Sequence, residues 1–295
     1  MLGHLRKLAT RRARAGERPA APGVSVVIGS YNRAALLRLA IESVRDNLRG
    51  IAHEIIVVDG GSEDGAVPWL CAQRDVILIL QHNRELRDGR KVARRSWGYF
   101  MNLGFKAAQG EYVLMLSDDC LVLPGAVPNA LQAAHAQCAA GRKVGGVAFY
   151  FRNWPLERDY YVQRTIGNRL MVNHGLFLRS ALQQVDWADE NTYRFYKADG
   201  DLNLRLWAAG YEVIDCKASI VEHYMDAGEE IRNANNAVLE ADRKAYAETW
   251  KGVFSRGRGL DIGGKVTLRF TDPENIAQRI FGAYRERDAN QRRAG

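Results

Sequence analysis

The sequence predicts an α/β fold in which helices cover both faces of a mostly parallel sheet. Between Val24 and Asp119, short apolar runs typical of buried strands alternate with segments that have helical spacing of apolar residues. Such alternation is typical of consecutive βαβ units, whose strands run parallel. Polar clusters follow three of these strands, at 30–32, 59–62 and 117–119. Because ligands bind beyond the carboxyl ends of strands in such sheets, these clusters should converge on one site.

The expected strands are short apolar runs, placed at 24–28, 54–58, 76–80, 111–117, 144–151, 169–178, 211–215 and 221–224. The expected helices lie at 34–48, 97–108, 125–140, 198–210, 236–253 and 273–287. Ser62 is predicted to cap a further helix between the second and third strands. Residues 152–169 show few regularities and are predicted to form a long loop.

The 295-residue chain divides into a basic arm at 1–22, a main domain at 23–225 and a helical extension at 226–295. No apolar run approaches the ~18 residues that a membrane-spanning helix needs, and the first residues lack a signal-peptide pattern. The four cysteines have neither pairing nor metal-ligand spacing, which indicates a reducing compartment. We therefore expect a cytoplasmic protein.

The formal net charge of +8 favours anionic partners without choosing among phosphates, acidic lipids and nucleic acid. Two interpretations of the arm at 1–22 stay open: an amphipathic helix on the inner membrane face, or a solvated tail. A nucleic-acid binder should carry a basic stripe with interleaved aromatic residues, and beyond the arm the sequence has none. We therefore expect no nucleic-acid partner.

Asp118 and Asp119 directly follow the apolar run that ends at Ser117. Desolvating an unpaired carboxylate is costly, and two adjacent carboxylates also repel each other. A divalent cation at the end of the strand would relieve both effects, and Mg²⁺ is typically bound by one or two carboxylates plus substrate phosphates. For an isolated Asp-Asp pair a solvated turn would be the better interpretation, but the flanking strand favours the metal.

These motifs, in this order, resemble family 2 glycosyltransferases of the GT-A fold over about residues 23–250. The matching segments are the opening strand and turn at 24–33, the strand with a nucleotide-contacting aspartate at 54–62, the approach to the metal motif at 102–119, the helix of the catalytic base at 198–211, and the ending Asp242, Tyr246 and Trp250. Two positions depart from the family pattern, because Ser117 and Ala198 stand where acidic residues are usual.

The resemblance implies transfer of a sugar, with inversion, from a nucleoside-diphosphate sugar to a hydroxyl of a glycan or lipid-linked acceptor. UDP is the family-level expectation for the nucleotide, and Mg²⁺ or Mn²⁺ for the metal. The residues that the resemblance assigns are the base Asp199, the metal ligands Asp119 and His223, and the nucleotide-sugar contacts Ser30, Tyr31, Asn32, Asp59 and Asp118.

Several of these residues also have a purely structural interpretation. From the sequence alone, Asp199 and Asp201 compete for the role of base; Asp201 is placed to pair with Arg205 four residues later, and Asp199 could cap the helix. His223 could simply pack at the end of a strand, and Asn32 could simply form a turn. The resemblance favours Asp199.

Two other functions are alternatives to the transferase. A non-catalytic scaffold that binds sugar nucleotides or glycans would be consistent with Ser117 and Ala198. A sugar nucleotidyltransferase should carry a glycine-rich phosphate loop after the first strand, and residues 29–33 lack those glycines.

Overall fold

The computed structural model describes residues 23–82, 94–224, 229–254, 264–269 and 290. The basic arm at 1–22 and the helix expected at 273–287 lie outside this part of the chain. Among the described helices, none is long and apolar enough to cross a membrane.

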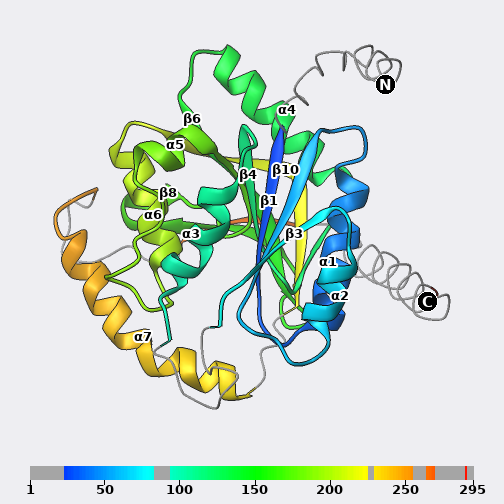
Figure 1. Ribbon diagram of the computed structural model, residues 1–295. Coiled ribbons are helices and arrows are strands. Elements are labelled where there is room, and N and C mark those ends of the chain that lie inside the picture. Colours follow the sequence, from blue (N-terminus) through cyan, green and yellow to red (C-terminus); the bar gives the residue numbers. More distant parts are fainter. Residues whose placement is uncertain (1–22, 83–93, 225–228, 255–263, 270–289, 291–295) are drawn as a thin grey trace, which may run out of the picture.

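Eleven strands of the described chain form one sheet around which helices pack (Figure 1). The strands are β1 (Val24–Ser30), β2 (His53–Asp59), β3 (Val76–Leu80), β4 (Tyr112–Ser117), β5 (Cys120–Val122), β6 (Val144–Trp154), β7 (Tyr160–Thr165), β8 (Arg169–Leu170), β9 (Gly175–Leu178), β10 (Glu212–Tyr224) and β11 (Lys265–Leu268). The main path of the sheet has the order β11-β7-β6-β9-β4-β1-β2-β3. β1 pairs in parallel with both β2 and β4, and β2 with β3, as the sequence predicts.

The second half of the sheet is mixed rather than parallel. β9 lies between β4 and β6 and runs antiparallel to both. β10 runs parallel to β6 along most of its length, and its last residues pair antiparallel with β5. In that pairing His223 lies opposite Cys120, so the end of β10 reaches the segment that follows the two adjacent aspartates.

The helices are α1 (Ala34–Asn47), α2 (Ala66–Ala72), α3 (Trp97–Ala107), α4 (Ala126–Ala139), α5 (Arg179–Gln184), α6 (Ala198–Ala208) and α7 (Glu229–Thr249), with a 3-10 turn η1 (Ile166–Asn168). α1, α2 and α4 cover one face of the sheet, where residues such as Leu37, Ile41 and Leu70 are buried. α3, α5 and α6 cover the other face (Figure 1). The α/β class with helices on both faces is therefore confirmed.

α7 lies outside α6 and is joined to it by a small third core (Figure 1). Tyr246 is fully buried there, and Trp250 packs beside it against Tyr193 and Leu204. Glycine matters at this contact, because a Cβ on Gly200 would lie 3.0 Å from the Tyr246 hydroxyl.

Several local predictions were wrong. Residues 152–169 are not one loop, because the consecutive buried residues Tyr160, Tyr161 and Val162 form β7, which pairs with β6 and β11. The strand expected at 169–178 is two strands, β8 and β9. The two strands expected at 211–215 and 221–224 are a single β10 that contains a bulge between Cys216 and Ile220.

Two predicted helix caps are also wrong. Ser62 does not cap α2, which begins at Ala66 after Gly65 in a left-handed conformation. No aspartate caps α6: its N-cap is Lys197, whose φ of 68° is left-handed, and Asp199 lies inside the first turn. That turn favours acidic side chains because of the helix dipole.

Candidate functional site

A cavity of about 690 Å³ lies at the carboxyl ends of β1 and β4, where the sequence places the site. Ser30, Tyr31, Asp118, Asp119, Asp199 and His223 all line it. Six of the eight predicted site residues therefore lie around one cavity, although the first and last of them are almost two hundred residues apart in the sequence. Asn32 and Asp59 are not among the lining residues.

The two adjacent aspartates are buried and share one cation. Arg33 Nη1 lies 3.0 Å from Asp118 Oδ1 and 2.5 Å from Asp119 Oδ2. The backbone N–H of Tyr31 also donates to Asp118 Oδ2 at 3.3 Å. Burial raises the pKa of Asp118, and the charge of Asp119 adds to this rise while Arg33 opposes it. Burial acts in the same direction on Asp119, but His223 and Arg33 outweigh it and lower its pKa.

Asp119 and His223 fit a divalent cation. Asp119 Oδ1 is buried and accepts no hydrogen bond from the described residues. His223 Nε2 lies 3.3 Å from this oxygen. Asn153 Oδ1 lies 2.8 Å from His223 Nδ1 and accepts a hydrogen bond from it in the tautomer that carries its hydrogen there. In that tautomer Nε2 offers a lone pair to a metal ion. A carboxylate oxygen and an imidazole lone pair that face each other form a suitable pair of ligands for one metal ion.

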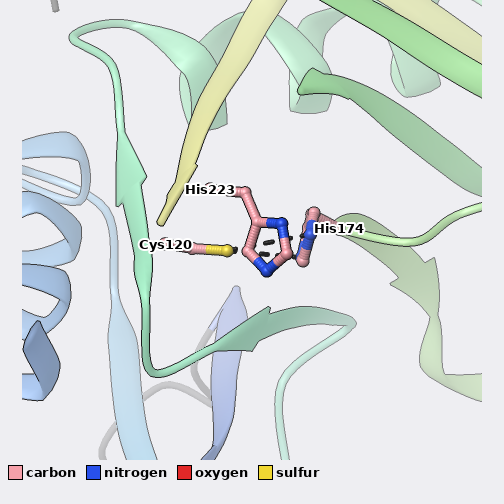
Figure 2. Close-up of side chains that lie close together, drawn as sticks. All are labelled: Cys120, His174 and His223. Carbon is pink, nitrogen blue, oxygen red and sulfur yellow. Dashed lines mark hydrogen bonds between the residues drawn. The ribbon is translucent and has the colours of Figure 1, made fainter. Parts of the chain in front are cut away.

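Cys120 and His174 lie close to His223 (Figure 2). His174 Nδ1 is 3.5 Å from Cys120 Sγ, and the ring packs edge-on against Phe151 with centroids 5.1 Å apart. Burial lowers the pKa of His174 to about 3, and the neighbouring His223 adds to this effect. Burial likewise raises the pKa of the Cys120 thiol. Both side chains are therefore neutral at physiological pH.

Asp199 is the second carboxylate on the cavity wall. Asn173 Nδ2 donates to Asp199 Oδ2 at 2.9 Å, and the N–H of Gly200 donates to Oδ1 at 2.8 Å. Burial raises the pKa of Asp199, and Gly200, Lys197 and Asn173 partly oppose the rise. Such a carboxylate is held in a fixed orientation and has a raised proton affinity, two properties of a general base.

Asp201 is occupied by structural contacts. Arg205 Nε donates to Asp201 Oδ2 at 2.8 Å, which confirms the predicted ion pair. Trp250 Nε1 donates to Oδ1 at 2.9 Å, and the Tyr193 hydroxyl lies 3.2 Å from the same oxygen. Asp201 does not line the cavity, so the geometry favours Asp199 over Asp201 as the base.

Asp59 and Asn32 shape the loops beside the cavity. Asp59 Oδ1 accepts the N–H groups of Gly61 and Ser62, and Oδ2 accepts the Ser62 hydroxyl at 2.8 Å. Asn32, with a left-handed φ of 51°, accepts the N–H of Glu63 at 2.8 Å. Its own N–H donates to the Ser62 hydroxyl. The contact of either residue with a nucleotide stays a prediction.

The sequence analysis gives no role to three residues that line the cavity, Arg33, Asn173 and His174. Arg33 and Asn173 contact the carboxylates, and His174 contacts Cys120. Two buried aspartates require a nearby cation, and Arg33, the N-cap of α1 three residues after β1, is the signal for it in the sequence. Asn173 carried no such signal, because its pairing with Asp199 depends on how β9 and α6 pack. Four basic residues lie close together in the sequence: Arg90, Lys91, Arg94 and Arg95. Arg94 donates to Asn235 at 2.6 Å and Arg95 lies over the Tyr99 ring, while Arg90 and Lys91 lie outside the described residues.

Comparison with known proteins gives a family match and several relatives. A family model described as "Glycosyl transferase family 2" matches residues 25–181. The uncharacterized glycosyltransferase YwdF of Bacillus subtilis is 26% identical over 238 residues, which cover 76% of this chain and 81% of that protein. The GalNAc(5)-diNAcBac-PP-undecaprenol beta-1,3-glucosyltransferase of Campylobacter jejuni is 30% identical over 144 residues, which cover 47% of this chain and 40% of that protein.

Two solved structures share the fold of this chain. The mannosyltransferase PcManGT from Pyrobaculum calidifontis, in complex with GDP-Man and Mn²⁺, superimposes with a TM-score of 0.53 at 19% identity, covering 85% of this chain and 73% of that chain. TarS of S. aureus superimposes with a TM-score of 0.50 at 15% identity, covering 80% of this chain and 44% of that chain. At these identities the likeness shows a shared fold.

Proposed function

Because the chain belongs to glycosyl transferase family 2, we propose that it moves a sugar from a nucleoside-diphosphate sugar to an acceptor hydroxyl, with inversion and with a divalent metal. The observation that carries this proposal is that Asp119, whose buried Oδ1 faces His223 Nε2, and the oriented base candidate Asp199 line one cavity. UDP is the proposed nucleotide, and a glycan or a lipid-linked sugar is the proposed acceptor.

The donor would be held at the ends of β1 and β4. Tyr31 offers an aromatic face for the base of the nucleotide, and Ser30 is a buried hydroxyl residue beside Asp118 on the cavity wall. Asp118 provides acceptor oxygens for a ribose or sugar hydroxyl. Asn32 and Asp59 keep the adjoining loops in place, and we propose that they border the nucleotide.

Asp119 and His223 would hold the metal ion, which neutralises the charge that develops on the leaving diphosphate. Arg33 already contacts both aspartates, so a cation and Arg33 would compete for their oxygens unless the guanidinium turns toward the diphosphate. Its side chain is about 20% exposed and lies on the cavity wall, which allows such a turn.

Asp199 would remove the proton of the acceptor hydroxyl while that oxygen attacks the anomeric carbon. The bond between the anomeric carbon and the diphosphate oxygen breaks, the diphosphate leaves with the bonding electrons, and a carboxylate oxygen of Asp199 takes the proton. Attack from the face opposite the leaving group inverts the configuration. Asn173 and Gly200 keep the carboxylate oriented for this transfer.

Calorimetric titration of UDP, GDP and dTDP, each with and without Mn²⁺, tests the donor site. We expect one nucleotide to bind with Mn²⁺, and Asp119→Ala to weaken this binding about tenfold or more. Asp199→Asn should bind the same nucleotide normally and lose about 10²–10⁴-fold in transfer rate. If no nucleotide binds under any condition, the transferase proposal fails and a non-catalytic scaffold becomes the better interpretation.

A further inference from the structure

Three metal-ligating side chains converge at the inner wall of the cavity, and the proposed transfer uses only one of them. Figure 2 shows Cys120, His174 and His223 pointing toward one another, and their ligand atoms lie within 4.8 Å of each other. They come from β5, from the residue before β9 and from β10. The antiparallel pairing of β5 with β10 places Cys120 opposite His223, and the His174 carbonyl accepts the N–H of Phe149, so the backbone fixes all three positions.

The spacing suits a tetrahedral site. Zinc–sulfur and zinc–nitrogen bonds of about 2.3 and 2.0–2.1 Å separate the two ligand atoms by about 3.6 Å. Cys120 Sγ lies 3.5 Å from Nδ1 and 3.7 Å from Nε2 of His174. Because these distances are nearly equal, the sulfur faces the imidazole ring and not one lone pair. Metal binding therefore requires the His174 ring to turn about its Cβ–Cγ bond.

A carboxylate oxygen lies beside His223, although it is not within 4.8 Å of all three other ligand atoms. Asp119 Oδ1, the buried oxygen without a hydrogen bond, lies 3.3 Å from His223 Nε2. Asn153 holds His223 through Nδ1, which directs Nε2 inward. The combined donor set is one sulfur, two imidazole nitrogens and one carboxylate oxygen. His174 and His223 both line the cavity, which gives an ion a path from solvent.

We propose that Cys120, His174, His223 and Asp119 form a binding site for one zinc-type ion. Thiolate and imidazole ligands favour Zn²⁺ and Co²⁺, whereas Mg²⁺ and Mn²⁺ favour oxygen ligands. On binding, the Cys120 thiol releases its proton to the solvent and its sulfur binds the metal. Asp119 and His223 are shared with the proposed catalytic ion, so zinc excludes that ion and inhibits transfer. Only this inhibition rests on the proposed function.

Titration of the full-length protein with Co²⁺ tests the site without any assay of activity. A thiolate bound to Co²⁺ produces an intense near-ultraviolet charge-transfer absorption. We expect this band in a variant that keeps only Cys120, namely Cys71→Ser, Cys138→Ser and Cys216→Ser combined, because Cys71 and Cys138 are exposed and Cys216 is only partly buried. One equivalent of Zn²⁺ should abolish the band. Adding Cys120→Ser should remove it and weaken Zn²⁺ binding about tenfold or more.

X-ray absorption of the zinc-loaded three-cysteine variant gives a second measurement that leaves Cys120 intact. One sulfur at about 2.3 Å is expected in the first coordination shell of the zinc. A shell with only nitrogen and oxygen, or a cobalt band that survives Cys120→Ser, overturns the proposal. Mn²⁺-dependent nucleotide binding should persist in Cys120→Ser, so a failure of the donor site is distinguishable from a failure of the zinc site.

Discussion

At the level of a single residue, the two polar atoms of the Asn173 side chain have different surroundings. Its Nδ2 group donates to the Asp199 carboxylate, while its buried Oδ1 accepts no hydrogen bond from the described residues. The first contact favours the ionised form of Asp199 and orients it. Asn173 itself is among the residues that line the cavity. Asn173 is therefore a positioning residue for the proposed base.

Asn173→Ala should move the acidic limb of the rate profile toward higher pH. Removing a hydrogen bond of ~0.5–1.5 kcal/mol from the ionised carboxylate raises the pKa of Asp199 by about 0.4–1 unit. Because the base acts when deprotonated, a higher pH is then needed for full activity. The measurement is kcat against pH. Asn191→Ala, at an exposed position away from Asp199, is the matched control and should leave the profile unchanged.

His174 should make the folded state sensitive to acid. Its pKa is about 3 in the folded protein and near 6.5 when exposed. The unfolded chain therefore binds the proton first, so this stability is complete above pH 6.5 and is lost as pH falls toward 3. The loss amounts to at most about 5 kcal/mol.

Urea unfolding in chelator between pH 7 and pH 4 measures this loss. His174→Gln, whose side chain does not titrate, should show a clearly smaller decline than the wild type over that range. His53→Gln is the control, because His53 is exposed on the surface and its replacement should leave the decline intact. Equal declines in His174→Gln and the wild type would contradict the prediction.

At the level of elements, strands β1 to β4 and the helices α1 and α3 follow local signals, and the sequence predicts them to within one or two residues at each end. Apolar runs with glycine and proline boundaries specify these units independently of the rest of the chain. The wrong predictions concern strands whose pairing partners are far away in the sequence. β7 is paired with β11, about a hundred residues later, and no local pattern in 152–169 reveals that partner. The pairing of β5 with β10 likewise joins segments about a hundred residues apart.

α3 shows how closely one element is fitted to another. A Cβ on Gly98, in its first turn, would lie 1.9 Å from the Asp189 carbonyl oxygen. Ser96 and Asn102 tie the same helix to this loop, through the carbonyls of Glu190 and Ala188. The helix and the loop at 186–193 therefore approach each other at backbone distance.

Gly98→Ala should destabilise the protein by about 1–3 kcal/mol, because the backbone must shift to admit the methyl group. Gly23→Ala is the matched control: its new Cβ would meet its nearest atom at an ordinary 3.5 Å. Chemical denaturation of the two variants measures the difference. Equal denaturation midpoints for Gly98→Ala and wild type would contradict this prediction, because the loop would then shift without loss of stability.

At the level of the whole molecule, the C-terminal helix α7 completes the site. Asp242 accepts the backbone N–H groups of Arg194, Phe195 and Tyr196, at 2.8, 2.9 and 2.8 Å respectively. This segment leads directly into Lys197 and the helix of Asp199. The sequence predicts α7, which carries residues that resemble the C-terminal motif of the family. Only the folded structure shows that Asp242 holds the segment before the proposed base Asp199.

Asp242→Ala should lower the transfer rate more than it lowers nucleotide affinity. Three backbone donors lose their acceptor, which destabilises the fold by about 1–3 kcal/mol and loosens the segment that positions Asp199. The donor site on β1 and β4 does not depend on this contact. Glu240→Ala, on the same helix with an exposed ion pair to Arg243, is the control and should change neither quantity. Equal losses of rate and affinity in Asp242→Ala would contradict this separation.

The position of β9 between β4 and β6 has a consequence for the order in which a growing chain can fold. β4 leaves the ribosome long before its neighbour, because about 60 residues separate the two strands, or roughly 3–12 s of synthesis at about 5–20 residues/s. During that interval the edge of β4 that faces β9 has no partner within its own chain. An unpaired apolar edge is a template for other chains. The late pairing of β9 brings Asn173 and His174 to the cavity. Until β9 is synthesised, the edge of β4 in the nascent chain must be kept from pairing with other chains.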